Sequence, residues 1–232
     1  MSFLSTAASS TVVSHVVTPG ELPGLVAGWG LPPVRGVVVL LGGAAGMSEA
    51  DTLRAARAVA EGVCAAVVEA GAALVDGGTD AGVMLLAGRA RADSGATFPL
   101  VGVVPEGVVG ARIEPHHTHV LAVPGSAWGD ETPWLFRLAQ EIAGDRAVVA
   151  VLINGGPIAR REIAEGLRLG RRIIIVAGTG RAADELAGAS ALGDGDDPER
   201  HTAETGLLEV IDADQPDTLR ARLLSELREG TE

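Results

Sequence analysis

The feature that most constrains the fold is a unit that repeats along the chain after Arg35. In each unit a short apolar run rich in β-branched residues is followed by glycine and then by an alanine-rich amphipathic segment. Such runs are typical of strands that are buried on both faces of a sheet. The predicted strands are Val37–Leu41, Ala73–Val75, Leu100–Val104, Val120–Val123, Val148–Ile153, Ile173–Val176 and Leu207–Ile211.

Helical segments separate these strands in near-strict alternation. They are predicted at Ser48–Ala70, Ala81–Ala92, Pro133–Ala143, Ala159–Leu169, Ala182–Ala189 and Pro216–Arg228. Alternation of this kind favours an α/β fold: a Rossmann-like, doubly wound, mostly parallel sheet with helices on both faces. A chain of 232 residues is long enough for one such core. We predict a single domain over residues 35–232, with residues 1–34 as an N-terminal extension or peripheral cover.

Charge and composition limit the partners and the compartment. The formal net charge of -12 argues against nucleic acid and anionic membranes, which an acidic protein repels. The chain shows neither a secretory signal nor an apolar stretch of membrane-spanning length, so a cytoplasmic location is expected. The single cysteine, Cys64, lies in an alanine- and valine-rich segment and is predicted to be a core residue. Every basic residue is arginine, so a charged phosphate contact must come from a guanidinium group.

Glycine-rich turns follow four of the predicted strands. They are Gly42-Gly43-Ala44-Ala45-Gly46, Asp76-Gly77-Gly78-Thr79-Asp80, Asn154-Gly155-Gly156 and Gly178-Thr179-Gly180-Arg181. Any one of them can be ordinary turn chemistry. In a parallel sheet, however, all four lie at the carboxyl edge, where glycine lets backbone amides approach a phosphate. Together they predict a pocket for a phosphate-bearing ligand.

Two features refine that pocket. Arg181 opens a predicted helix and is expected to bind phosphate, the alternative being a surface ion pair with Asp184 or Glu185. The glycine spacing does not match the dinucleotide-binding fingerprint, and no GK[ST] sequence is present. A conventional dehydrogenase or P-loop ATPase is therefore not expected.

The segment from Glu114 to Trp134 is rich in histidine and tryptophan. We expect His117 and His119 to hydrogen-bond a phosphate, a ribose hydroxyl or a buried backbone group. The alternative is a zinc site completed by Glu114 or Asp130, but one short segment supplies an incomplete ligand set, and no metal is predicted. A tryptophan of the 128–134 segment can stack on a base or anchor a helix in the core. The acidic segment 193–201 is predicted to be a solvated loop, with a calcium loop as the alternative.

Together these segments resemble the prokaryotic TRPM-associated (LSDAT) branch of the SLOG superfamily. The resemblance covers nearly all of residues 37–186, and its most specific parts are DGGTDAGVM at 76–84, HHTHVLAVPG at 116–125, WGDETPWL at 128–135, INGG at 153–156 and GTGRAADELA at 178–187. It implies a Rossmann-like domain that senses nucleotides or NAD-derived molecules such as ADP-ribose and cyclic ADP-ribose. The ligand-lining residues that it implies are Gly42, Gly43, Gly77, Gly78, Thr79, Gly155, Gly156, Gly178, Thr179, Gly180 and Arg181.

A sister branch contains the LOG-type phosphoribohydrolases, to which the chain is distantly similar. Their PGGxGTxxE motif is replaced here by Asn154-Gly155-Gly156-Pro157-Ile158, without the GT pair, although Glu162 or Asp184 can substitute spatially for the catalytic glutamate. Catalytic residues are left unassigned. A pair among Asp76, Asp80, Asp130 and Glu131 can act as general acid and base only if two of them meet in the pocket.

The sequence thus predicts a protein that binds or senses a nucleotide or NAD-derived ligand and requires no cofactor. The ligand site comprises the residues implied above together with Asp76, Asp80, His117 and His119, with Asp76 or Asp80 orienting a ribose. The alternatives are an N-glycosidic hydrolase and a non-binding oligomeric scaffold. Self-association into a homo-oligomer is a further expectation, drawn from the oligomeric LOG enzymes.

Overall fold

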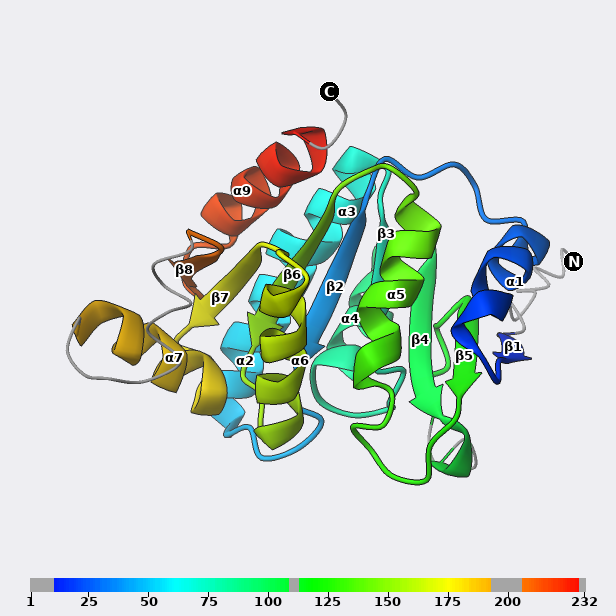
Figure 1. Ribbon diagram of the computed structural model, residues 1–232. Coiled ribbons are helices and arrows are strands. Elements are labelled where there is room, and N and C mark those ends of the chain that lie inside the picture. Colours follow the sequence, from blue (N-terminus) through cyan, green and yellow to red (C-terminus); the bar gives the residue numbers. More distant parts are fainter. Residues whose placement is uncertain (1–10, 109–112, 193–205, 230–232) are drawn as a thin grey trace, which may run out of the picture.

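The computed structural model describes residues 11–108, 113–192 and 206–229, without the side chains of 190–192 and 229. Within them, eight strands form one sheet in the order β1-β5-β4-β3-β2-β6-β7-β8, and every neighbouring pair is parallel (Figure 1). The strands are β1 (Val12–His15), β2 (Val37–Gly42), β3 (Ala73–Asp76), β4 (Leu100–Pro105), β5 (His119–Val123), β6 (Val148–Ile153), β7 (Ile173–Ala177) and β8 (Leu208–Asp212). The predicted α/β, Rossmann-like fold is confirmed.

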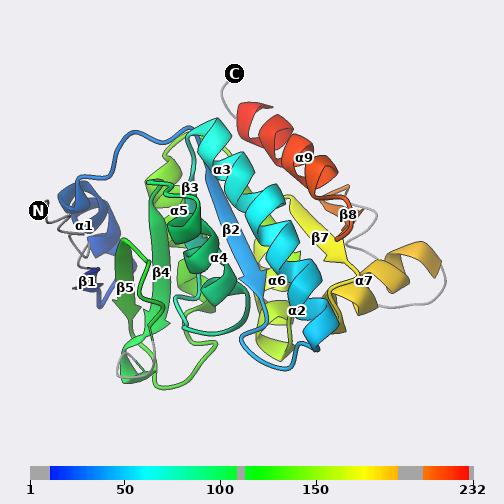
Figure 2. The ribbon, with the colours of Figure 1, turned by 180° about the vertical axis from the view of Figure 1, so that it is seen from behind.

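Helices cover both faces of this sheet. The helices are α1 (Leu22–Trp29), α2 (Glu49–Arg57), α3 (Ala65–Ala70), α4 (Gly82–Asp93), α5 (Thr132–Ala143), α6 (Pro157–Arg168), α7 (Arg181–Leu192) and α9 (Pro216–Glu229). A π-helical segment, Ala58–Cys64, joins α2 to α3 and makes one long helix of the predicted 48–70 segment. Helices α1, α5, α6 and α7 lie on the face seen in Figure 1, and α2, α3, α4 and α9 lie on the face seen in Figure 2.

Apolar side chains of alternate strand residues fill two cores, one on each side of the sheet. In β3, for example, Leu74 packs beneath α3 and α4, whereas Val75 packs beneath α5. This is the alternation expected of a strand between two helical layers. Cys64 is buried in the first core, as predicted.

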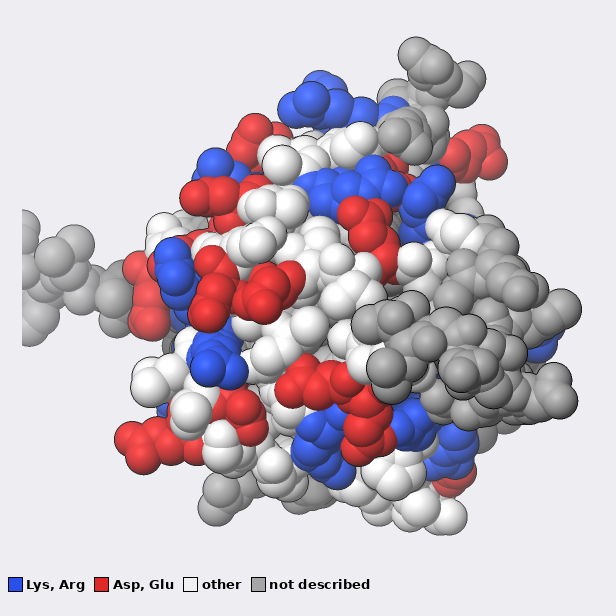
Figure 3. All heavy atoms as spheres, turned by 90° about the vertical axis from the view of Figure 1, so that its left-hand side faces the viewer, with Lys and Arg blue, Asp and Glu red and all other residues white. Residues whose placement is uncertain are grey.

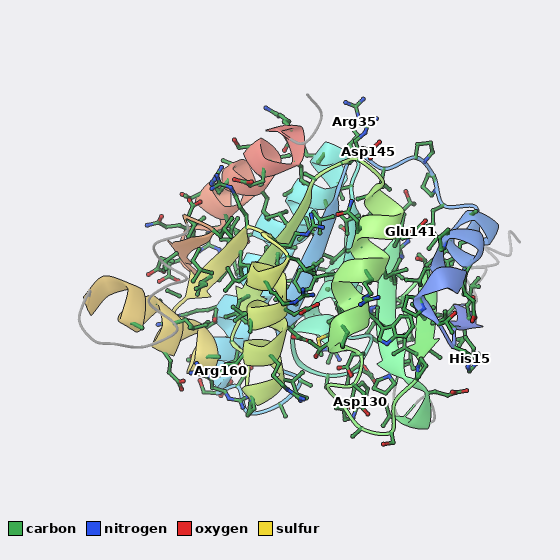
Figure 4. All side chains as sticks on the ribbon, viewed as in Figure 1. His15, Arg35, Asp130, Glu141, Asp145 and Arg160 are labelled. Carbon is green, nitrogen blue, oxygen red and sulfur yellow. The ribbon has the colours of Figure 1, made fainter. Side chains whose placement is uncertain are left out.

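The chain changes direction at the centre of the sheet. Strands β2 to β5 extend the sheet step by step toward β1, and the next strand, β6, then pairs with the opposite side of β2. A crevice forms at such a switch point, outside the carboxyl ends of the two strands. These ends lie toward the bottom of Figure 4, near the labels of Asp130 and Arg160, whereas Arg35 and Asp145 mark the opposite edge.

Two elements near the N-terminus, β1 and α1, were not predicted. Residues predicted as a peripheral cover contribute edge strand β1, which pairs with β5, and helix α1, which packs on α5. The β4–β5 connection contains a short 3-10 turn, Glu106–Val108, rather than a helix in its described part. Residues 113–118 of this connection pack against the sheet on the α4 side through Glu114 and His117. The acidic segment 193–201 lies outside the described residues.

The surface mixes charges despite the net charge of -12. Figure 3 shows arginine and acidic side chains interspersed over the side where α7 and α9 lie. Several are paired, such as Arg222 with Glu209 and Arg172 with Glu226. Of the helices in the described residues, none combines the length and apolar character needed to cross a membrane.

Candidate functional site

A cavity of about 290 Å³ occupies the switch point between β2 and β6. We call it the switch-point cavity. It is lined by Leu40, Gly42, Gly43, Ala44, Ala45, Gly77, Thr79, Met84, Trp128, Glu131, Gly156, Pro157, Ile158, Ala159, Glu162 and Arg181. Three of the four predicted glycine turns therefore line one cavity, and Arg181 from the fourth joins them.

The turn after β2 offers unused backbone donors. The N–H groups of Ala44, Ala45 and Gly46 have no acceptor within the described residues. The close approach of this turn to β6 requires glycine, because a β-carbon on Gly42 would collide with the carbonyl oxygen of Ile153. Consecutive free amides of this kind form an anion-binding concavity.

Helix α6 begins at the same cavity. Its N-cap residue, Gly156, has no side chain to accept from the first turn, and Pro157 occupies the first helical position. The first-turn residues Ile158 and Ala159 line the cavity. The N–H groups of an uncapped helix start and the helix dipole both favour a negatively charged group.

Arg181 connects these two sets of donors. Its Nη1 donates to the carbonyl oxygen of Ala45 at 2.6 Å, and its guanidinium lies against the backbone of Gly46 and Gly156. The residue adopts a left-handed conformation with φ of 55°, which is uncommon outside glycine and asparagine. Arg181, the Ala44–Gly46 amides and the start of α6 form what we call the anion-binding set.

The other residues of the fourth turn form hydrogen bonds within the protein and do not line the cavity. The N–H groups of Gly178 and Gly180 both donate to the carboxylate of Asp184. Thr179 is fully buried, and its hydroxyl donates to the carbonyl oxygen of Val176 and accepts from the N–H of Asn154. These bonds hold the turn in the shape that presents Arg181.

Two carboxyl groups complete the cavity wall. Glu162 on α6 is 6% exposed and Glu131 before α5 is 3% exposed. Burial and, to a smaller degree, the charges of Glu131 and Asp76 raise the pKa of Glu162 to about 8, although Arg161 opposes the shift. The carboxyl of Glu162 has no hydrogen-bond partner among the described residues. We call Glu131 and Glu162 the carboxyl pair.

Glu131 is held by its own turn. Its Oε2 accepts from the N–H of Gly129 at 2.6 Å, and burial raises the pKa of its carboxyl. Both glutamates are named above as possible catalytic carboxyl groups, but neither is among the predicted ligand-binding residues. Their signal is positional: Glu162 lies six residues after Gly156, on the second turn of α6, and Glu131 immediately precedes α5.

Asp76 and His117 meet beside the cavity, in the interior. His117 Nε2 hydrogen-bonds Asp76 Oδ1 at 2.8 Å, and His117 Nδ1 hydrogen-bonds Glu114 Oε2 at 2.9 Å. Burial disfavours the imidazolium, but the carboxylates of Asp76 and Glu114 outweigh it and raise the pKa of His117 to about 9. Asp76 also accepts from the N–H of Gly78, so this charged network holds the 76–79 turn. We call Asp76, Glu114 and His117 the buried triad.

His119 lies at the amino end of β5, away from the cavity. Its ring packs on Trp29 with centroids 5.0 Å apart, and burial lowers its pKa. His117 and His119 thus have separate partners, and the described residues contain no group of three or more side chains arranged to hold a metal. The alternative of a zinc site finds no support in this arrangement.

The structure divides the predicted site residues into two groups. Those that line the cavity are Gly42, Gly43, Gly77, Thr79, Gly156 and Arg181. Those outside its lining are Asp76, Gly78, Asp80, His117, His119, Gly155, Gly178, Thr179 and Gly180. Most residues of the second group are glycines or polar residues that shape the turns beneath the lining.

Solved structures with a similar fold exist at low sequence identity. The X-ray structure of TM1055, a structural genomics target, aligns with a TM-score of 0.55 and 21% identity over 81% of this chain and 99% of that chain. The molybdenum cofactor carrier protein from Chlamydomonas reinhardtii aligns with a TM-score of 0.53 and 16% identity over 82% of this chain and 98% of its own. At these identities the likeness concerns the fold alone.

The family of the chain is shown by its sequence rather than by these structures. No curated protein matches the chain in sequence. A family model described as "SLOG in TRPM, prokaryote" matches residues 35–221, which include every segment that lines the switch-point cavity. The chain therefore belongs to the prokaryotic TRPM-associated family of SLOG proteins.

Proposed function

We propose that this protein binds a nucleotide-derived, phosphate-bearing ligand of the ADP-ribose, cyclic ADP-ribose or NAD class in the switch-point cavity. The observation that carries the proposal is the anion-binding set. Free loop amides, an uncapped helix start and a guanidinium group border one cavity in a protein whose net charge is -12. Such donors match the oxygens of a phosphate group. A cytoplasmic location and self-association remain predictions.

Replacing Arg181 with alanine should weaken binding of ADP-ribose and AMP by about 10- to 100-fold, because a charge-assisted contact is lost. Isothermal titration calorimetry measures this effect. Arg181→Lys retains the charge but not the planar fork and should give an intermediate affinity. Arg57→Ala, which removes an exposed pair with Glu61, is the matched control and should bind as the unaltered protein does.

Equal affinities for Arg181→Ala and the unaltered protein would contradict the assigned role of Arg181. Absence of binding by the unaltered protein to AMP, NAD, ADP-ribose and cyclic ADP-ribose would contradict the proposed function itself. That second result would favour the non-binding scaffold.

The carboxyl pair favours a second candidate function, the hydrolysis of an N-glycosidic bond. With a pKa of about 8, Glu162 is mostly protonated at neutral pH and can donate a proton to a departing base. Glu131, when ionised, can accept a proton from the water that attacks the anomeric carbon. The bond from sugar to base breaks, the bond from sugar to water oxygen forms, and the products are the free base and the ribose phosphate.

Glu162→Gln should lower adenine release from AMP by 100-fold or more, while binding persists. Nicotinamide leaves NAD as a neutral base and takes no proton, so its release should depend less on Glu162. Chromatography of the released base measures turnover. Activity of the unaltered protein should fall as the pH rises through about 8, because the acid form of Glu162 disappears. Glu165→Gln on the same helix, where the carboxylate pairs with Arg168, is the matched control. If the unaltered protein releases no base from any of these ligands, the hydrolase assignment is wrong.

The same variant has a readout that needs no ligand. The folded protein raises the pKa of Glu162 from 4.5 to about 8, so the folded state holds this proton more tightly than the unfolded state. Stability therefore decreases as the pH rises from about 4.5 to about 8. Urea unfolding of Glu162→Gln should show a smaller decrease over that range, and an unchanged decrease would contradict the burial of this acid.

A further inference from the structure

Trp128 differs from the other two tryptophans in its surroundings. Trp134, on α5, is buried in the core, and Trp29 packs on His119 and donates its indole N–H to Ser14. Trp128 lines the switch-point cavity, is 36% exposed, and has no hydrogen-bond or ring partner among the described residues. A large aromatic side chain left about one third exposed at a cavity is a candidate contact for a ligand.

Several hydrogen bonds fix the conformation of the turn that contains Trp128. The carboxylate of Asp130 accepts from the N–H groups of Ser126 at 2.9 Å and Ala127 at 3.1 Å. Gly129 has φ of +101°, and its N–H donates to Glu131. Trp128 and Glu131 are therefore held by one set of hydrogen bonds on the same wall of the cavity. An indole positioned before the ligand arrives loses little entropy on binding.

The other residues of the lining define the chemistry of the cavity. Leu40, Met84 and Ile158 contribute apolar surface, and the carboxyl pair contributes an acceptor and, from protonated Glu162, a donor. A sugar phosphate has no flat apolar surface to match the apolar part of this lining. A nitrogen heterocycle does, because it stacks through its faces and forms hydrogen bonds through its edge.

We propose that the ligand carries a planar nitrogen base that stacks on Trp128, with the base edge facing the carboxyl pair. This inference rests on the proposed function, since the anion-binding set would hold the phosphate of the same molecule. It adds to the proposed function the part of the cavity that recognises the base of the nucleotide. Trp128 is thereby a specificity-determining residue.

The test compares AMP with ribose 5-phosphate, which lacks the base, by isothermal titration calorimetry. The unaltered protein should bind AMP more tightly than ribose 5-phosphate. Trp128→Ala should weaken AMP binding by about 5- to 150-fold and leave ribose 5-phosphate binding unchanged. Trp128→Phe retains an aromatic face and should restore most of the preference for AMP. Binding of AMP should also quench tryptophan fluorescence in the unaltered protein, and this quenching should be absent in Trp128→Phe.

The outcomes separate the two proposals. If ribose 5-phosphate binds and AMP binds no more tightly, the base-stacking inference is wrong and the anion-binding site stands. If Trp128→Ala weakens both ligands equally, Trp128 acts on the shape of the cavity and the inference is again wrong. If the unaltered protein binds neither AMP nor ribose 5-phosphate, the base-stacking inference is wrong, and the proposed function is wrong as well if NAD, ADP-ribose and cyclic ADP-ribose also fail to bind. Leu169→Ala, an exposed apolar residue just after α6, is the control for surface truncation and should change neither affinity.

Discussion

Replacing His117 with alanine is expected to lower the free energy of unfolding by about 3–5 kcal/mol at pH 6.5. The imidazolium lies between the carboxylates of Asp76 and Glu114, and all three side chains are buried. Removing the positive group leaves two carboxylates in the interior without their shared partner. Urea unfolding measures the loss. His15→Ala is the matched control, because His15 forms an exposed pair with Glu106 and should matter little (Figure 4).

The buried triad also predicts a pH dependence with a definite sign. The pKa of His117 is about 9 in the folded protein and 6.5 in its unperturbed state. Its stabilisation is therefore fully present below pH 6.5 and is lost as the pH rises through about 9. Glu162 contributes a decrease between pH 4.5 and 8, so the comparison is best made in the Glu162→Gln background. His117→Ala should then be nearly flat from pH 6.5 to 9. If His117→Ala lowers the free energy of unfolding by less than about 1 kcal/mol and leaves its pH dependence unchanged, the positive charge assigned to His117 in the buried triad is wrong.

Replacing Gly82 with alanine is expected to be the most damaging change next to the cavity, because Gly82 packs against the lining residues Gly43 and Ala44. Gly82 opens α4 with φ of +54°, and a β-carbon there would overlap the carbonyl oxygen of Gly43 and Cα of Ala44. The same carbonyl accepts the N–H of Val83 at 3.2 Å. Because backbone must move, the expected cost is about 3 kcal/mol or more. The shift would also displace the free amides of Ala44–Gly46 and abolish binding of AMP.

Gly71→Ala is the matched control for Gly82→Ala. Gly71 has a similar φ of +66°, and a β-carbon there would meet no atom within 4 Å. This control therefore measures left-handed backbone strain alone, about 1 kcal/mol. Urea unfolding and calorimetry with AMP on both variants separate strain from steric overlap. If the two variants lose equal stability and both bind AMP, the contact between the β2 turn and α4 does not shape the cavity.

Local patterns predicted most of the elements. The expected strand over residues 148–153 is observed at the same residues, and the helix expected at Ala81–Ala92 is observed at Gly82–Asp93. Both carry their signal within a few consecutive residues, as an apolar run or a helical period. Strand β1 was not predicted. Its residues Val12 and Val13 are exposed, and this short edge strand depends on pairing with β5. No helix was predicted in the β4–β5 connection, and in the structure Glu114 and His117 cover the sheet there.

The candidate site could be predicted only in part from the sequence. The glycine-rich turns after four strands marked the correct edge of the sheet, since turn chemistry is local. Glycine alone did not distinguish a free amide from an occupied one. The amides of Gly178 and Gly180 donate to Asp184, whereas those of Ala44 and Ala45 find no acceptor in the part of the chain that the structure describes. The difference depends on where an acceptor lies after the turn has folded.

By itself, the repeated strand, glycine and helix unit determined a parallel sheet with glycine turns at its carboxyl edge, and it placed Arg181 at a helix start. The tertiary structure decided which groups face the cavity and which form hydrogen bonds within the protein. His117 pairs with Asp76 across 41 residues of sequence, and Glu162 on α6 shares a cavity with Glu131 from the turn before α5. Hydrogen-bond partners and burial depend on distances in space, and these side chains acquire their pKa values and their roles only when the strands and helices pack.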